Sequence, residues 1–89
     1  MAAIHKLNAN FVATQVDDEI LLIDLKGGEL FSLSGTAKAV WEMIDGKRDI
    51  HEIASALCSA FEAPVETIED DVRSLVRSLS ELHLVGTEL

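Results

Sequence analysis

The chain has 89 residues, which suffices for one small domain with a single hydrophobic core. Its formal net charge is −9, from 16 acidic and 7 basic side chains, so it lacks the basic surface that nucleic acids and anionic membranes attract. No apolar run reaches the roughly 18 residues of a membrane span, and the first ten residues lack the apolar stretch of a signal peptide. A single cysteine, Cys58, excludes an internal disulfide and fits a reducing compartment, so we expect a cytoplasmic protein.

The first third of the chain predicts β-structure. Three short apolar runs are typical of strands: residues 11–16, 20–25 and 29–33. Between the second and third runs, residues 26–28 (Lys-Gly-Gly) supply the flexible backbone of a tight hairpin. In the third run, Phe31 and Leu33 point to one face of the sheet, because side chains alternate along a strand. Leu30 and Ser32 point to the other face.

The rest of the chain predicts three amphipathic helices. Ser34 is a suitable N-cap for the first, and Gly46 is expected as its left-handed C-terminal cap. The second helix begins at Asp49, with Glu52 three residues later as a capping box requires. The third extends over about 65–84. The apolar stripes of the three helices are Ala37, Val40, Trp41 and Ile44; then Ile50, Ile53, Ala54, Leu57 and Phe61; then Ile68, Val72, Leu75, Val76, Leu79 and Leu82.

No pattern in the sequence predicts catalysis or a metal site. The histidines are scattered, and His51 lies about 10 Å from Cys58 along the second helix, too far to share an ion. No serine lies in a Gly-x-Ser-x-Gly motif. An acidic cluster at the start of the third helix is typical of a first turn, where negative charge complements the helix dipole. Its members are Glu66, Glu69, Asp70 and Asp71. We therefore expect a non-catalytic protein without metal or cofactor.

Several segments follow one another in a specific order and spacing: residues 30–35, 40–46, 50–57, 71–79 and 84–86. This arrangement resembles the coenzyme PQQ synthesis protein D (PqqD-like) family. The resemblance implies a single domain over 1–89, with its core at about 9–86. It also implies an α+β fold of winged helix-turn-helix type, in which a three-stranded antiparallel sheet is followed by three helices.

The resemblance further implies a function in recognising ribosomally synthesised, post-translationally modified peptides. In that family the leader peptide of a precursor adds as an extra strand beside the third strand, in a groove between this strand and the third helix. Carried over to this chain, the peptide-binding residues are Leu30, Phe31, Ser32, Leu33, Asp71, Leu75, Ser78, Leu79 and Leu82. The implied partners are the precursor peptide and a peptide-modifying enzyme, such as a radical SAM enzyme, a lasso-peptide protease or a cyclase.

The residues support such a role independently of the resemblance. An edge strand exposes unpaired N–H and C=O groups, and residues 29–33 contain no lysine or proline that would prevent another chain from pairing. The acidic surface favours capture of a basic peptide.

Two other readings stay open at this point. A winged helix could bind DNA, but the acidic start of the third helix would then face the phosphates. A homodimer is the other alternative, because residues 21–23 make the second strand apolar on both faces. Whether Arg73 and Arg77 contact a peptide or only balance neighbouring acids is not decided by the sequence.

Overall fold

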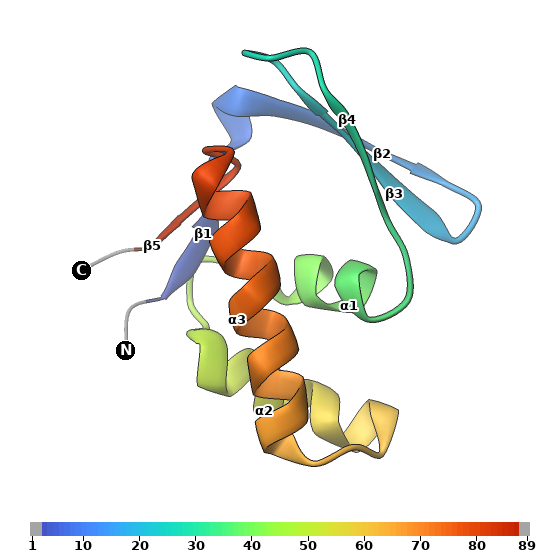
Figure 1. Ribbon diagram of the computed structural model, residues 1–89, viewed down its shortest axis with the longest axis vertical. Coiled ribbons are helices and arrows are strands. Elements are labelled where there is room, and N and C mark those ends of the chain that lie inside the picture. Colours follow the sequence, from blue (N-terminus) through green and yellow to red (C-terminus); the bar gives the residue numbers. More distant parts are fainter. Residues whose placement is uncertain (1–2, 88–89) are drawn as a thin grey trace.

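The computed structural model describes residues 3–87 (Figure 1). Its elements are β1 (Ile4–Lys6), the 3-10 turn η1 (Asn8–Asn10), β2 (Phe11–Val16), β3 (Glu19–Asp24), β4 (Leu30–Leu33), α1 (Gly35–Met43), α2 (Ile50–Phe61), α3 (Val65–Glu81) and β5 (Val85–Thr87). Strands β2, β3 and β4 form an antiparallel sheet with β3 at its centre. In Figure 1 this sheet lies at the top, α1 lies below it, and α3 lies to one side. The predicted winged helix-turn-helix order of three antiparallel strands and three helices is confirmed.

The sheet has one buried and one exposed face, as the alternation of side chains predicts. Ile20 and Leu22 of β3 are buried, and they pair with Leu33 and Phe31 of β4. Ile23, the residue after Leu22, points outward and is 42% exposed. The helices therefore cover only one face of the sheet.

The β3–β4 connection is longer than the tight turn that the Gly-Gly pair predicts, because Asp24 organises it. The Asp24 carboxylate accepts hydrogen bonds from the backbone N–H groups of Lys26 (3.0 Å) and Gly27 (3.2 Å). Gly28 has a φ of +71°, which glycine adopts without strain. The connection spans residues 25–29, so β3 ends one residue earlier, and β4 begins one residue later, than predicted.

The predicted cap of α1 is wrong, because the helix ends before Gly46. Its last residue is Met43 and its C-cap is Ile44. Gly46 is left-handed (φ +82°), but it serves the following turn, where its N–H donates to the Ile4 carbonyl at 2.8 Å. The left-handed glycine thus joins the end of α1 to β1.

The ends of α2 and α3 follow from local hydrogen bonds. The capping box of α2 is confirmed: the Asp49 carboxylate accepts from the Glu52 N–H at 2.8 Å, and the Glu52 carboxylate accepts from the Asp49 N–H at 3.1 Å. Helix α3 ends earlier than predicted, because the Leu84 N–H donates to the Leu79 carbonyl (2.9 Å) with His83 left-handed at φ +61°. This is a Schellman motif, which closes the helix at Glu81.

A second, two-stranded sheet pairs β1 with β5, and neither strand was predicted from the sequence. Ile4 of β1 and Val85 of β5 are buried in the core. His5 lies opposite Gly86, where a Cβ atom would come within 3.3 Å of the imidazole ring. Glycine at this position therefore gives the ring the space it needs. Because β1 pairs with β5, residues before position 9 take part in the fold.

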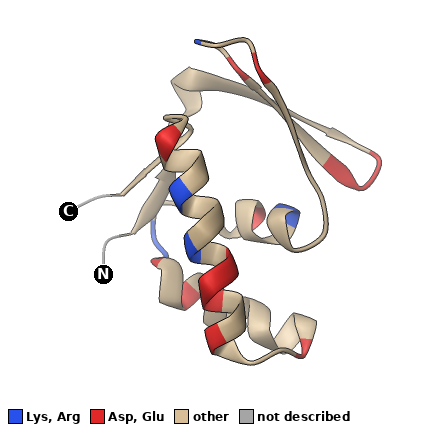
Figure 2. Cartoon of the chain, viewed as in Figure 1, with Lys and Arg blue, Asp and Glu red and all other residues tan. Residues whose placement is uncertain are grey.

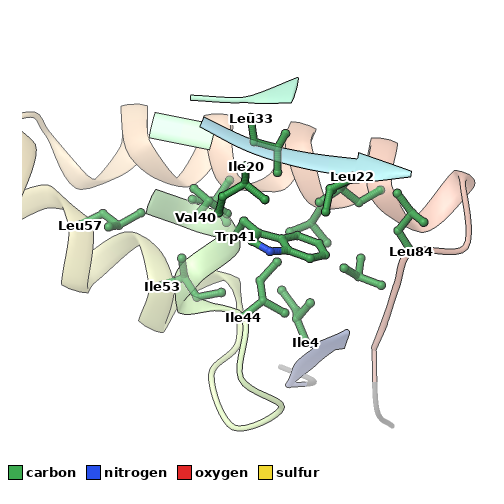
Figure 3. Packing of buried hydrophobic residues seen from close by; sticks show 14 of the residues in the cluster. Ile4, Ile20, Leu22, Leu33, Val40, Trp41, Ile44, Ile53, Leu57 and Leu84 are labelled. Atoms are coloured by element: carbon green, nitrogen blue, oxygen red, sulfur yellow. The ribbon is translucent and has the colours of Figure 1, made fainter. Parts of the chain in front are cut away.

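The core is one aliphatic cluster centred on Trp41, which is buried as predicted (Figure 3). The Trp41 ring meets Phe11 edge to face, with centroids 5.2 Å apart, and Lys6 Nζ lies 4.6 Å from its centroid. Burial of the Lys6 ammonium lowers its pKa. Within residues 3–87, no helix combines the length and apolar composition needed to cross a bilayer.

The two faces of β3 should differ sharply in their contribution to stability. Leu22→Ala removes a side chain that is 0% exposed, and we expect it to lower the free energy of unfolding by about 2–5 kcal/mol. Ile23→Ala, on the outer face of the same strand, should cost less than about 1 kcal/mol. Urea unfolding followed by Trp41 fluorescence measures both values. Similar losses for the two variants would contradict the assignment of faces.

Candidate peptide-binding site

Strand β4 forms one edge of the sheet, and its backbone pairs only with β3 among residues 3–87. The Asp24 N–H donates to the Glu29 carbonyl at 2.9 Å, which fixes the phase of hydrogen bonding between the two strands. In an antiparallel pair, residues alternate between bonding the neighbouring strand and facing away from it. This alternation directs the N–H and C=O groups of Leu30 and Ser32 to the open side. We call these groups the β4 edge.

The β4 edge lies next to the helical layer of the domain. Helix α1 packs against β3 and β4, and it also contacts α3. Leu33 is buried in the core and Phe31 is packed against it, whereas Leu30 is 63% exposed. A strand added to this edge would consequently have one face toward the helices and one face toward solvent.

A flank of α3 supplies the other half of the predicted site. Four residues recur at helical spacing on this side, beside the stripe that faces the core. We call them the α3 flank: Asp71, Leu75, Ser78 and Leu82. Leu75 and Leu82 are half-buried against the core, and the other two are exposed. The flank therefore offers partly covered apolar surface between polar side chains.

The structure divides the predicted site residues into two groups. Seven of them belong to β4 or to the α3 flank and have exposed or half-buried side chains: Leu30, Phe31, Ser32, Asp71, Leu75, Ser78 and Leu82. The remaining two, Leu33 and Leu79, are buried members of the core. Both would support a peptide-binding surface from beneath. Their contact with a peptide stays a prediction.

Ser32 lies next to a carboxylate, that of Glu19, which was not predicted from the sequence as part of the site. Its hydroxyl donates to Glu19 Oε1 at 3.0 Å, across the outer face from β4 to β3. Glu19 makes no ion pair with any residue in the described range 3–87. Figure 2 shows acidic residues at the β2–β3 turn and no basic residues along the three strands. The edge of the sheet thus carries an uncompensated negative charge.

Arg73 lies in an ion-pair cluster around Glu69, on the side of α3 away from the α3 flank. Its Nη2 lies 2.8 Å from Glu69 Oε1, and the second oxygen of Glu69 lies 3.3 Å from His51 Nδ1 on α2. Arg73 is two residues from Leu75, which corresponds to a rotation of about 200° around the helix. Arg77 follows Arg73 by one turn on the same side. The two arginines therefore lie away from the α3 flank.

The β4 edge and the α3 flank present hydrogen-bonding backbone groups and apolar surface. Among residues 3–87, no three histidine, cysteine or carboxylate side chains are placed so that they could hold a metal ion. Cys58 is half-buried, and its Sγ donates to the Ser55 carbonyl at 3.2 Å within its own helix. The β4 edge provides backbone donors and acceptors, and the α3 flank provides apolar contact.

This fold and this edge define a winged helix-turn-helix domain whose strand β4 is open on one side and packs against α1. The chain belongs to the coenzyme PQQ synthesis protein D (PqqD) family, whose model matches residues 19–85. It is 37% identical over 57 residues to a PqqA binding protein of Gluconobacter oxydans (strain 621H). It is 43% identical over 44 residues to a PqqA binding protein of Rhizobium meliloti (strain 1021).

These matches cover 64% and 49% of this chain, and the chain spans about half the length of the two relatives, 59% and 45%. Two solved structures share the fold over nearly the whole chain. TbiB1 in complex with the TbiA(beta) leader peptide has a TM-score of 0.81 at 26% identity, and the match covers 94% of this chain and 98% of that one. Lasso peptide synthetase B1 complexed with the leader peptide has a TM-score of 0.83 at 25% identity, with coverages of 96% and 99%.

The cluster around Glu69 should be visible in an acid titration. The hydrogen bond from His51, followed by that from Arg73, lowers the pKa of the Glu69 carboxyl. Its contribution to stability is therefore present at neutral pH and is lost as the pH falls through this lowered pKa. We expect His51→Ala and Arg73→Ala each to raise the pKa of Glu69 toward its ordinary value. Carboxyl carbon NMR titration measures the change, and an unchanged pKa in both variants would disprove the cluster.

Proposed function

We propose that this chain is a non-catalytic binding protein for the leader peptide of a ribosomally synthesised, post-translationally modified precursor. The observation that carries the proposal is the β4 edge, where Leu30 and Ser32 have unpaired backbone groups beside the helical layer. The proposal is further supported by the relatives named PqqA binding protein and by similar structures that contain a leader peptide.

Binding proceeds by strand addition. The peptide backbone pairs with Leu30 and Ser32, and alternate peptide side chains point toward Phe31 and the α3 flank. Backbone hydrogen bonds provide affinity for any extended chain, whereas the side-chain contacts select among sequences. A short peptide loses conformational entropy on binding, so we expect a free energy of about −8 to −10 kcal/mol, which is micromolar affinity or somewhat tighter.

Presentation to a modifying enzyme is the second part of the proposal. One structural neighbour is named lasso peptide synthetase B1, which supports an enzyme partner. A peptide held as an edge strand keeps its remaining length outside the domain, where an enzyme can reach it. A radical SAM enzyme, a lasso-peptide protease and a cyclase are the partner classes that this role suits.

Self-association is a second candidate role, and it is favoured by the outer face of the sheet. Val12, Ile23 and Leu30 are adjacent in the strand register and all three are exposed. Such an apolar row can be covered by the same face of a second copy. Sedimentation velocity over a hundredfold range of concentration tests this role, and a constant monomer mass would exclude it.

DNA binding is opposed by charge. The first two turns of α3, which would enter the major groove, carry the exposed acids Glu66, Asp70 and Asp71. Arg73 is already paired with Glu69. The helix would therefore meet the phosphates with like charge.

Ser32→Pro should weaken peptide binding about tenfold or more, because proline removes the N–H that faces the open edge. The β3–β4 ladder should survive, since this N–H does not bond to β3. Ser32→Ala is the matched control: it removes the hydroxyl but keeps the N–H, and should bind nearly normally. Fluorescence anisotropy with the leader of a precursor encoded beside the gene measures affinity, and circular dichroism verifies folding. Normal affinity in a folded Ser32→Pro variant would contradict strand addition at β4.

A further inference from the structure

The outer face of the β4 edge carries a side-chain arrangement that bears on peptide selection. In antiparallel addition, the peptide residue directly opposite Ser32 lies on the same face of the sheet as the Ser32 side chain, with Cβ atoms about 5 Å apart. The Glu19 carboxylate is held over Ser32 by the 3.0 Å hydrogen bond. A long peptide side chain at this position can reach that carboxylate across Ser32, whereas a short one cannot.

The charge of this face favours a cation. Residues 11–25 and 29–34 contain no lysine or arginine, and Glu19 has no ion-pair partner within residues 3–87. The only basic residue of the β3–β4 hairpin is Lys26, at its tip (Figure 2). A lysine or arginine of the peptide would form a charge-assisted hydrogen bond with a carboxylate that is otherwise unneutralised.

The inner face imposes a different requirement on the neighbouring positions. Peptide residues on either side of the one opposite Ser32 point to the face on which Phe31 and Leu33 lie. In the proposed binding mode they meet Phe31, which is half-buried against the core, and the half-buried Leu75 and Leu82 of the α3 flank. Polar side chains here would lose water without gaining a partner, so apolar side chains are preferred.

From these contacts we infer that the domain selects an extended apolar–basic–apolar segment, with its lysine or arginine opposite Ser32 and bound by Glu19. The inference rests on the proposed function, because it requires strand addition at β4. Glu19 is thus a specificity-determining residue, whereas the backbone of Leu30 and Ser32 provides affinity independent of sequence.

Selection from a random twelve-residue peptide library displayed on phage tests the inference without knowledge of the natural leader. Peptides enriched on the wild-type chain should share a lysine or arginine between two apolar residues. Glu19→Gln can keep the hydrogen bond to Ser32 and should abolish the basic preference while leaving the apolar one. Asp18→Asn is the matched control, since it removes the same charge one residue away and should retain both preferences.

A double-mutant cycle with one selected peptide then measures the contact. Glu19→Gln should weaken the basic peptide about two- to fivefold, which is the range for a partly exposed ion pair. It should leave a peptide with glutamine at the basic position unaffected, whereas Asp18→Asn should change the affinity of the basic peptide less than Glu19→Gln does.

The outcomes separate the inference from the proposed function. The selected peptides are also tested for binding to Ser32→Pro. If they lose affinity for this variant but show no basic preference, the inference is overturned and strand addition stays intact. Equal losses for Glu19→Gln and Asp18→Asn would also overturn it. Peptides whose binding is unaffected by Ser32→Pro would contradict the proposed function itself.

Discussion

The open edge of β4 depends on how the five short strands β1–β5 pair with one another through backbone hydrogen bonds. Strands β1 and β5 could in principle cover an edge of the larger sheet, but they pair with each other instead. Strand β4 consequently keeps one row of unpaired donors and acceptors among residues 3–87. Soluble proteins usually protect such rows with charge, proline or a covering segment, because they attract other chains. An open, unprotected edge of this kind is suited to binding an extended peptide.

In the proposed binding mode, backbone groups and side chains have different roles. In strand addition, backbone groups of the β4 edge would bind without regard to sequence, so selectivity would come from side chains on the two faces of the added strand. In the proposed binding mode, Leu75 and Leu82 would provide apolar contact on one face, and Glu19 would provide charge on the other. Arg73, which the sequence left undecided, is held by Glu69 on a different side of α3. On the outer face, the charged side chain that the proposed binding mode places near the peptide is therefore the acidic Glu19.

Features set by local sequence could be predicted, whereas those set by distant contacts could not. The alternation of Phe31 and Leu33, the Asp49–Glu52 capping box and most of the helix stripes are local. Phe61 was wrongly predicted for the buried stripe of α2, because it lies at the end of that helix and is 41% exposed. The β1–β5 pair joins residues about eighty positions apart through three-residue strands, which are too short to show a period. The candidate site likewise combines features that could be predicted with one that could not. Its residues followed from the family resemblance, but the outward direction of the Ser32 N–H depends on a register fixed by the Asp24–Glu29 hydrogen bond.

Hydrogen exchange of the β4 amides tests the central claim most directly. In the free protein, the amides of Phe31 and Leu33 should exchange slowly because they bond to β3, and those of Leu30 and Ser32 should exchange rapidly. A saturating leader peptide should slow exchange at Leu30 and Ser32 and leave the other two nearly unchanged. Slow exchange at Leu30 and Ser32 in the free protein, or no added protection in the complex, would contradict an open edge that binds a peptide strand.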